Sequence, residues 1–556
     1  MTEGKKAAHE HAVLLKAIAH GAGQYPKPQG VNYTYGTAGF RTLGSKLPSV
    51  MFRVALLAIL RSKRLEGATI GVMVTASHNP EPDNGVKLVD PSGEMLDPTW
   101  ETHATALANC PTTESLISTF TTLVAHLRVD LRQPASIFYA RDTRPSGPEL
   151  IEALEAGLKA FGEGVNYQNV GVTTTPILHY VVKATNVQDG SYGEPTIDGY
   201  LEKMSSAFKT LIGNRKLSPL YVDCANGVGT HSLIALQKYL GDSLPIYPLN
   251  IDTSTKGALN HNCGADFVKT RQTLPPSIQK AGYLNKVGSR ACSLDGDADR
   301  IVYYYIDEKK GTFRLLDGDK IAVMVAIFLG DLIKKAKLEQ ENELTVGVVQ
   351  TAYANGSSTK YLTSRNIPVS CVPTGVKHLH HAAQRFDIGV YFEANGHGTV
   401  LFSPSTISTL KSTKPTSPDT ANALKYLLAL NDLINQAVGD AISDMLLVET
   451  VLAHRGWGAP EWDAGYEDLP NRLVKVEVPD RTIFVAIDAE RRLESPRGLQ
   501  EKIEAVMGKF EQGRSFVRPS GTEDCVRVYA ETALSPEADT LASAVAELVR
   551  QAAGMV

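Results

Sequence analysis

The sequence predicts a mixed α/β protein with several domains and a smaller α+β segment at its C-terminal end. Two observations carry this prediction. Short apolar strands are repeatedly followed by a polar loop and an amphipathic helix, which is typical of layered α/β folds. The chain of 556 residues is also too long for one hydrophobic core, so about three to five domains are expected.

The strand–loop–helix units follow one another along most of the chain. Strands are expected at residues 70–74, 137–139, 220–222 and 346–349. Helices are expected soon after the last three of these strands, one with Pro148 in its first turn, one over 233–240 and one after Asn355-Gly356. No repeat with a fixed period is visible, although the recurring units permit several similar domains. In such folds functional residues lie on loops at strand ends.

The last part of the chain has a different pattern. A strand is expected at 473–478, helices at 499–510 and 541–553, and two further strands around Phe516 and Val526. Polar, glycine-containing or charged stretches at 186–195, 307–311 and 456–471 suit connections between domains. The stretch 403–417 is rich in Ser, Thr, Pro and Lys and is interpreted as a surface excursion.

Composition excludes several classes of function. The net charge of −4 argues against nucleic acid or anionic lipid as the main partner. No apolar stretch approaches the roughly 20 residues that cross a bilayer, and no secretory or transit peptide fits the first residues. The 6 cysteines are scattered without a C-x-x-C pair, which indicates reduced thiols and a cytoplasmic location. No obligate protein partner is evident.

Three carboxylates predict a magnesium site. Asp295, Asp297 and Asp299 alternate along an extended loop, so their side chains point the same way. Oxygen ligands of this kind suit one Mg²⁺ ion. An EF-hand does not fit, because Arg300 and Ile306 stand where that loop needs glycine and glutamate. A solvated acidic turn is the plain alternative, with Arg300 either compensating the carboxylates or holding a phosphate.

Ser77, in the run Thr75-Ala76-Ser77-His78-Asn79-Pro80, is the candidate nucleophile. A serine hydroxyl is a poor nucleophile unless a base or a metal activates it, and a serine beside a magnesium site suggests a phosphoserine. Lys87 could move the proton or neutralise phosphate charge. The alternatives are a serine with a turn or capping role and a lysine in an exposed salt bridge.

Two further segments suit sugar and phosphate. In Glu393-Ala394-Asn395-Gly396-His397-Gly398-Thr399, a carboxylate and an amide at alternate positions can hold sugar hydroxyls or an acetamido group, and His397 is a possible proton carrier or a local hydrogen-bonding residue. Arg518-Pro519-Ser520-Gly521-Thr522, followed by Arg527, offers guanidinium and hydroxyl donors to an anion. A plain β-turn with unrelated arginines is its alternative.

Three other patterns do not indicate the sites that they resemble. His378, His380 and His381 lack a carboxylate or cysteine at ligand spacing, and a partly exposed helix face explains them better than zinc. Gly227-Val228-Gly229 lacks the third glycine of a dinucleotide site. No G-x-x-x-x-G-K-[ST] P-loop is present, so ATP is not expected as a phosphoryl donor through such a loop.

Taken together, the Ser77, Asp295–Arg300, Glu393–Thr399 and Arg518–Arg527 segments occur in the order found in the α-D-phosphohexomutase superfamily, which the chain resembles over nearly its whole length. The resemblance implies four domains around a central cleft, three related mixed α/β domains and a smaller α+β domain. The expected divisions are 1–190 with the phosphoserine loop, 191–308 with the metal loop, 309–455 with the sugar loop and 456–556 with the phosphate loop.

Within the superfamily, the chain resembles the eukaryotic branch that acts on N-acetylglucosamine phosphates. The run 36–41, the run 260–266 and Asn395, where glucose and mannose mutases typically have serine, carry this closer resemblance. It implies interconversion of N-acetylglucosamine 6-phosphate and 1-phosphate, toward UDP-N-acetylglucosamine, through phospho-Ser77 and a sugar bisphosphate. Phosphoglucosamine mutase or phosphoglucomutase activity is the alternative, followed by a metal-dependent sugar phosphatase and a non-catalytic sensor of sugar phosphates.

The resemblance also implies residue roles. The implied catalytic residues are Ser77, Lys87, Arg41 and His397, with Lys87 favoured as general base. The implied metal ligands are Ser77, Asp295, Asp297 and Asp299. The implied substrate-binding residues are Arg300, Thr374, Gly375, Glu393, Asn395, Arg518, Ser520, Gly521, Thr522 and Arg527.

Overall fold

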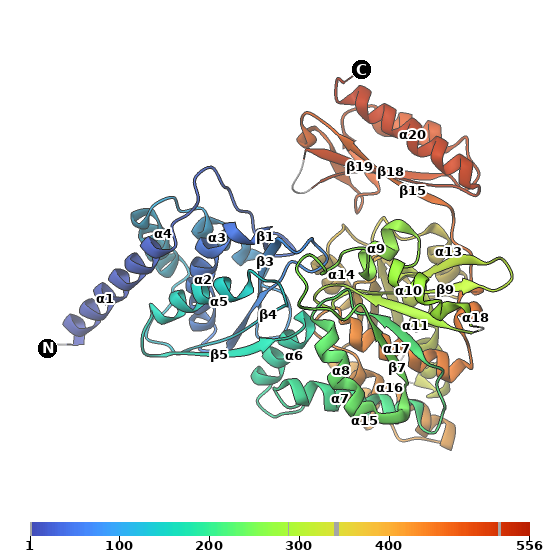
Figure 1. Ribbon diagram of the computed structural model, residues 1–556, viewed down its shortest axis with the longest axis horizontal. Coiled ribbons are helices and arrows are strands. Elements are labelled where there is room, and N and C mark those ends of the chain that lie inside the picture. Colours follow the sequence, from blue (N-terminus) through green and yellow to red (C-terminus); the bar gives the residue numbers. More distant parts are fainter. Residues whose placement is uncertain (1–2, 287, 339–343, 521–523, 556) are drawn as a thin grey trace. The chain divides into compact units, whose positions relative to one another are not determined.

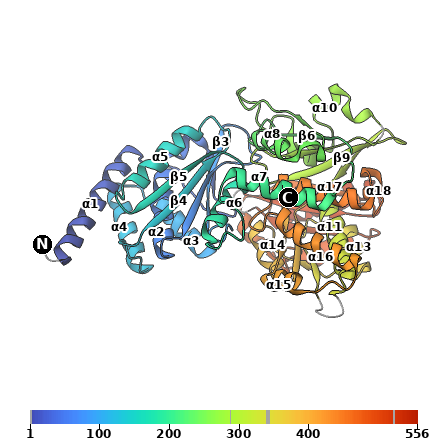
Figure 2. The ribbon, with the colours of Figure 1, turned by 90° about the horizontal axis from the view of Figure 1, so that it is seen from below.

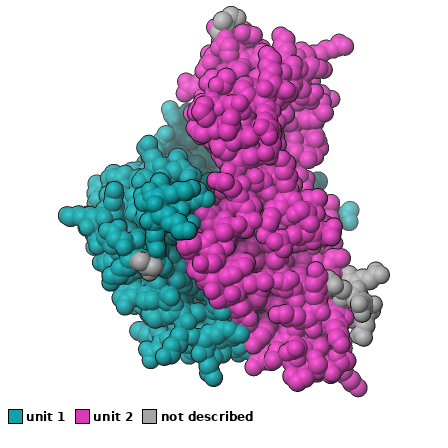
Figure 3. All heavy atoms as spheres, turned by 90° about the vertical axis from the view of Figure 1, so that its right-hand side faces the viewer, with its two compact units in different colours: residues 1–315, 432–453 teal, residues 316–431, 454–556 magenta. Residues whose placement is uncertain are grey.

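The computed structural model describes residues 3–286, 288–338, 344–520 and 524–555 (Figure 1). The chain divides into two compact units, coloured separately in Figure 3. Unit 1 comprises Met1–Leu315 and Asp432–Ala453, and unit 2 comprises Leu316–Asn431 and His454–Val556.

Unit 1 begins with a mixed sheet of strand order β1-β3-β2-β4-β5. Its strands are β1 (Phe40–Leu43), β2 (Thr69–Val74), β3 (Asp83–Val89), β4 (Ala135–Arg141) and β5 (Val165–Val172). The accompanying helices are α1 (Glu3–Gln24), α2 (Pro48–Arg64), α3 (Pro98–Ala108), α4 (Thr113–His126), α5 (Gly147–Lys159) and α6 (Thr175–Asn186). Strands β2, β4 and β5 run parallel, whereas β3 is antiparallel to both of its neighbours.

Helices cover both faces of this sheet, where β4 and β5 lie side by side (Figure 2). Alternate residues of a strand point to opposite faces. Accordingly, Ile70, Val72 and Val74 pack into the core formed with α2 and α5, whereas Met73 packs with Leu178 and neighbouring residues of α6. Burial on both faces explains why β2 has no charged or strongly polar residue after Thr69 instead of an alternating pattern.

A second mixed sheet completes unit 1, in the order β10-β9-β8-β6-β7. Its strands are β6 (Leu220–Asp223), β7 (Ile246–Leu249), β8 (Arg290–Leu294), β9 (Ile301–Asp307) and β10 (Thr312–Leu316). The helices of this part are α7 (Ile197–Ile212), α8 (Gly229–Leu240), α9 (Gly264–Arg271), α10 (Pro276–Ala281) and α17 (Ala441–Arg455), which lies almost wholly within the Asp432–Ala453 segment of unit 1.

Unit 2 contains the third mixed sheet, in the order β12-β11-β13-β14. Its strands are β11 (Val346–Gln350), β12 (Val369–Cys371), β13 (Ile388–Phe392) and β14 (Gly398–Phe402). The helices of this part are α11 (Gly318–Lys335), α13 (Gly356–Ser364), α14 (Val376–Ala383), α15 (Pro404–Ser412), α16 (Pro418–Leu433) and α18 (Ala459–Asp463).

The last part of unit 2 has a different architecture. Strands β15 (Asn471–Glu477), β19 (Cys525–Glu531) and β18 (Arg514–Pro519) form an antiparallel sheet, and β16 (Val485–Ile487) pairs with β17 (Arg492–Ser495). Helices α19 (Leu499–Met507) and α20 (Ser535–Ala552) contribute to its core, and Figure 1 shows α20 along the sheet. Three mixed sheets with their helices and one α+β part confirm the predicted fold class.

The three mixed sheets share one connection that matters for function. In each sheet a strand with a parallel neighbour leads through a short turn into an antiparallel strand: β2 into β3, β8 into β9, and β13 into β14. The predicted phosphoserine, metal and sugar segments occupy these three turns. The chemistry-bearing loops are therefore equivalent positions of one repeated topology.

One expectation needs correction: the expected division at residue 308 falls inside a hairpin, because β10 belongs to the same sheet as β9. The 403–417 stretch lies at the surface for most of its length, as expected, and it contains helix α15, which Ser403 caps. The 456–471 connection includes the short helix α18. The other domain limits stay predictions. Among the described helices, none combines the length and apolar character needed to cross a bilayer.

Candidate active site

Ser77 lies in the turn between β2 and β3 and is almost fully buried. Its φ of +52° is a left-handed conformation that costs free energy for a residue other than glycine. Its Oγ donates to Oδ2 of Asp295 at 2.5 Å and lies 3.4 Å from Nδ1 of His78. The predicted nucleophile therefore reaches the predicted metal loop directly.

Arg144, which the sequence analysis did not select, holds this strained turn. Its guanidinium is fully buried and donates to backbone carbonyl oxygens at 2.7 to 2.9 Å, those of Ser77, Asn79, Pro80 and Asp83. Asp142 accepts from Nε of Arg144 at 3.0 Å and from Oγ1 of Thr75 at 2.7 Å. The Asp-x-Arg pattern directly after a predicted strand was the available signal for this pair.

Asn260 holds the same turn from the second sheet's side of unit 1. Its Nδ2 donates to the carbonyl oxygens of Ser77 at 2.9 Å and Asn79 at 3.1 Å. Gly296 allows this close approach, because a Cβ added there would lie 2.5 Å from the Ser77 carbonyl oxygen and 2.9 Å from Asn260 Nδ2. From the sequence, Asn260 is noted only as part of the run 260–266 that carries the family resemblance.

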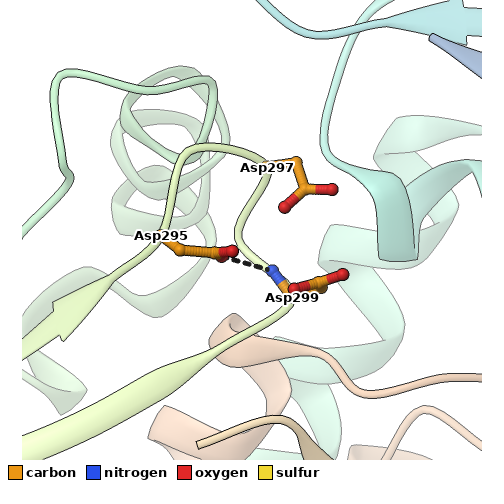
Figure 4. Close-up of side chains that lie close together, drawn as sticks. All are labelled: Asp295, Asp297 and Asp299. Carbon is orange, nitrogen blue, oxygen red and sulfur yellow. Dashed lines mark hydrogen bonds between the residues drawn. The ribbon is translucent and has the colours of Figure 1, made fainter. Parts of the chain in front are cut away.

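The three aspartates lie together in the turn between β8 and β9 (Figure 4). All are buried, and one ligand oxygen from each lies within 4.8 Å of the others. Oδ1 of Asp295 accepts from the backbone N–H groups of Asp299 at 3.0 Å and Arg300 at 3.1 Å. Burial raises the pKa of the Asp295 carboxyl well above its usual range, and the neighbouring charges of Asp299 and Asp297 raise it further.

The residues present fit a divalent cation. Oδ1 of Asp297 is buried and has no hydrogen-bond partner among the described residues, so this acceptor is available to an ion. Hard oxygen donors at this separation are the ligands that Mg²⁺ prefers. A bound cation would also offset the electrostatic repulsion among these carboxylates, which adds to burial in raising the pKa of Asp295.

Two side chains contact the aspartates from other elements. Thr175, the first residue of α6, is fully buried and donates from Oγ1 to Oδ2 of Asp297 at 2.7 Å. Lys87, on β3, places Nζ 3.5 Å from Oδ2 of Asp297 and 3.3 Å from Oδ2 of Asp299. Burial opposes the charged form of Lys87, but these two carboxylates outweigh it and raise the pKa of its ammonium group. Thr175 was not foreseen from the sequence.

Two arginines that were predicted as site residues contribute positive charge near His78. Arg41, on β1, donates to Oδ1 of Asn79 at 3.1 Å, and Arg300 lies 3.9 Å from Asp299. Burial, reinforced by the positive charges of Arg300 and Arg41, lowers the pKa of His78 to about 2. His78 is therefore a neutral imidazole beside the Ser77 hydroxyl, a feature that the serine-containing motif alone did not reveal.

In unit 2, the sugar-binding candidates share the turn between β13 and β14. Glu393 and Asn395 are half-buried and His397 is buried. The His397 N–H donates to Oδ1 of Asn395 at 3.0 Å, and the Glu393 N–H donates to the His397 carbonyl at 2.8 Å. The Asn395 side chain is thus positioned through its oxygen by the backbone of its own turn.

Several residues of unit 2 that were predicted to bind phosphate lie on or near the C-terminal sheet. Arg518 of β18 pairs in register with Arg527 of β19, which is exposed, and the Ser520 N–H donates to the Cys525 carbonyl. Gly521 and Thr522 lie outside the described residues. Thr374 and Gly375 precede α14, and the structure connects Thr374 with Arg518 through Glu490, which the sequence analysis did not select.

Comparison with protein families matches most of the chain. Residues 197–302 match "Phosphoacetylglucosamine mutase AMG1, domain II" and residues 317–457 match domain III of the same family. Residues 48–109 and 100–192 match "Phosphoglucomutase/phosphomannomutase, alpha/beta/alpha domain I", and residues 473–548 match the C-terminal domain of that group.

Individual relatives are similar over nearly their full length. Phosphoacetylglucosamine mutase of Sus scrofa is 51% identical, with 98% of each chain covered. The crystal structure of Aspergillus fumigatus N-acetylphosphoglucosamine mutase with GlcNAc-6P and magnesium is 54% identical, with 97% of this chain and 99% of that chain covered and a TM-score of 0.92. A serine-to-alanine variant of the A. fumigatus protein in complex with glucose 1,6-bisphosphate has the same identity, coverage and TM-score.

These similarities confirm the resemblance to the α-D-phosphohexomutase superfamily and its closer branch. Identity of about half over the whole length far exceeds what a shared fold alone produces. The chain belongs to the phosphoacetylglucosamine mutase family.

Proposed function

We propose that this protein interconverts N-acetylglucosamine 6-phosphate and N-acetylglucosamine 1-phosphate, a step toward UDP-N-acetylglucosamine. The single observation that carries the proposal is the contact between the Ser77 hydroxyl and Asp295 within a buried cluster of carboxylates. A hydroxyl in that position can carry a phosphoryl group and exchange it with a sugar hydroxyl. The reaction is an isomerisation in which the enzyme transfers one phosphoryl group to the sugar and is then rephosphorylated.

The phosphoryl transfer runs in two balanced halves. A free sugar hydroxyl loses its proton and its oxygen forms a bond to the phosphorus of phospho-Ser77, while the bond to Ser77 Oγ breaks. Ser77 Oγ takes up a proton, and a sugar bisphosphate results. The bisphosphate then presents its other phosphate, which passes back to Ser77 Oγ and leaves the isomeric monophosphate. Little covalent assistance is needed for such a transfer, so positioning and charge stabilisation supply most of the acceleration.

The chain's own residues would supply that positioning. Asp295, Asp297, Asp299 and Ser77 would hold Mg²⁺, which when bound neutralises charge on the phosphoryl group. Lys87 adds a positive charge beside the carboxylates. As the favoured general base, Lys87 would first have to lose its proton, which its raised pKa opposes in this arrangement.

Substrate recognition is assigned to unit 2. Glu393 is proposed to bind sugar hydroxyls and Asn395 the acetamido group, because carboxylate and amide groups occupy one turn. The phosphate that does not react is proposed to bind Arg518, Ser520 and Arg527, together with Gly521, Thr522, Thr374 and Gly375. Arg41, Arg300 and His397 are proposed to contact phosphate or carry a proton.

The setting of the reaction is proposed to be the cytoplasm. None of the six cysteines forms a disulfide, and all but Cys371 are buried. Free thiols of this kind suit a reducing compartment.

The proposal is tested by mass spectrometry and product analysis. Purified protein is mapped for a phosphoryl group on the Ser77 peptide, then incubated with N-acetylglucosamine 6-phosphate and Mg²⁺. The 1-phosphate should appear without free phosphate, and Ser77→Ala should abolish the interconversion. Steady phosphate release would show a phosphatase instead. Asn395→Ser tests sugar choice, since it should relax discrimination against glucose 6-phosphate.

A further inference from the structure

Glu490 binds two residues that are proposed to bind substrate. It lies in the turn between β16 and β17, and its side chain is 18% exposed. One carboxylate oxygen accepts from Nε of Arg518 at 2.9 Å. The other accepts from both the backbone N–H of Thr374, at 2.9 Å, and its Oγ1, at 2.5 Å.

This set of donors is one that would also bind phosphate. A guanidinium, a backbone N–H and a hydroxyl converge on the two oxygens of Glu490, and phosphate oxygens are recognised by the same three groups. The Arg518–Glu490 pair is mostly buried, so water screens it less than an exposed pair. A phosphate that approaches Arg518 therefore competes directly with the Glu490 carboxylate.

The turn that presents Glu490 is strained. Asp488, Ala489 and Glu490 all have left-handed φ values, +52°, +53° and +66°. Each such residue costs free energy unless its surroundings hold it in place. Arg491 bonds to Asp488 within the turn, and the contacts to Thr374 and Arg518 hold its end. Release of the carboxylate from these contacts would let the strained turn relax.

We propose that Glu490 is a specificity-determining residue that occupies the phosphate-binding donors when no ligand is bound and yields them to a phosphate dianion. The inference rests on the proposed function, which assigns Arg518 to phosphate. A ligand carboxylate brings no more charge than Glu490 already provides, so the exchange gains nothing. A phosphate monoester carries about −1.5 to −2 charges at neutral pH and displaces Glu490 favourably. The competing carboxylate thereby rejects weaker anions at the expense of absolute affinity.

The experiment compares Glu490→Gln and Glu490→Ala with the wild-type protein. Binding of inorganic phosphate to the full chain is measured by isothermal titration calorimetry, and mutase activity is measured in the same preparations. Glu494→Gln is the matched control, because it removes the same charge from an exposed position of the adjoining strand β17. Arg518→Met identifies the heat that arises from phosphate at this position.

We expect the affinity for phosphate to rise in a fixed order among the variants. Loss of a competing interaction of about 1 kcal/mol should make phosphate bind at least about fivefold more tightly to Glu490→Gln and more tightly again to Glu490→Ala, with Glu494→Gln unchanged. Arg518→Met combined with Glu490→Gln should abolish the gain. Unchanged or weaker binding in both Glu490 variants would overturn the inference, since it would mean that Glu490 only orients Arg518. Absence of mutase activity in the wild-type protein would instead overturn the proposed function.

Discussion

Replacement of Thr175 by valine should weaken the metal site without disturbing the fold. The hydroxyl of Thr175 donates to Oδ2 of Asp297 at 2.7 Å and is fully buried, and valine has nearly the same shape. A hydrogen bond to a charged group contributes about 1.5 to 3 kcal/mol. At 1.4 kcal/mol per factor of ten, removal of this hydrogen bond should lower the affinity of the site for Mg²⁺ by roughly 10- to 140-fold.

The loss should appear as a requirement for more Mg²⁺, because Thr175 fixes the orientation of a carboxylate that is proposed to bind the ion. Initial mutase rates are measured across a range of free Mg²⁺ concentrations, and the concentration for half-maximal rate is compared between wild type and Thr175→Val. The rate at saturating Mg²⁺ should change much less than this concentration.

Thr185→Val is the matched control for this experiment. It makes the same chemical change in the same helix, but the Thr185 hydroxyl donates only to the carbonyl of Val181, one turn earlier. Its Mg²⁺ requirement should equal that of the wild type, and the melting temperatures of both variants should be similar. An equal shift in both variants, or a fall in kcat with an unchanged Mg²⁺ requirement in Thr175→Val, would refute the reasoning.

Three other outcomes follow from the same contacts and from the half-buried Lys183. Asn260→Ala removes two hydrogen bonds to the Ser77 turn, each contributing about 1 kcal/mol, so kcat should fall by about 30-fold; an unchanged kcat would mean that Arg144 alone holds the turn. Gly296→Ala should lower kcat further, with the circular dichroism spectrum retained, because the new Cβ would lie 2.5 Å from the Ser77 carbonyl oxygen; full activity would show that the turn can move without loss. Burial lowers the pKa of Lys183 from 10.5 to about 8, so the unfolded chain binds more protons between these pH values and wild-type stability gains from this group as pH rises from 8 to 10.5. Urea unfolding should show that this gain, about 3 kcal/mol, is missing from Lys183→Met, and an equal pH dependence in both proteins would contradict the assignment.

Prediction from sequence succeeded where a side chain's chemistry and its neighbours along the chain are both visible. The alternation of Asp295, Asp297 and Asp299 predicted a carboxylate cluster, and the structure brings their oxygens together. The apolar run of β2 predicted a buried strand that ends just before Ser77. Local patterns of this kind depend only on strand geometry and burial, which the sequence displays directly.

The residues that escaped prediction act through contacts between distant segments. Arg144 lies 67 positions from Ser77 in the sequence, and Glu490 lies 116 positions from Thr374. An arginine or glutamate in a polar loop usually points to solvent, so a pattern such as Asp142-x-Arg144 does not by itself show that the arginine is buried against carbonyl groups. Only the tertiary structure shows that Arg144 is fully enclosed.

The repeated topology explains why three segments of unrelated sequence occupy equivalent turns. The phosphoserine, metal and sugar turns each follow a strand with a parallel neighbour and precede an antiparallel strand. The strands need only apolar residues of suitable shape, so their sequences diverge without a visible repeat, and each turn is free to carry different polar groups. Because a turn of this kind is fixed at both ends by sheet hydrogen bonds, it can hold a strained residue such as Ser77 without further disorder.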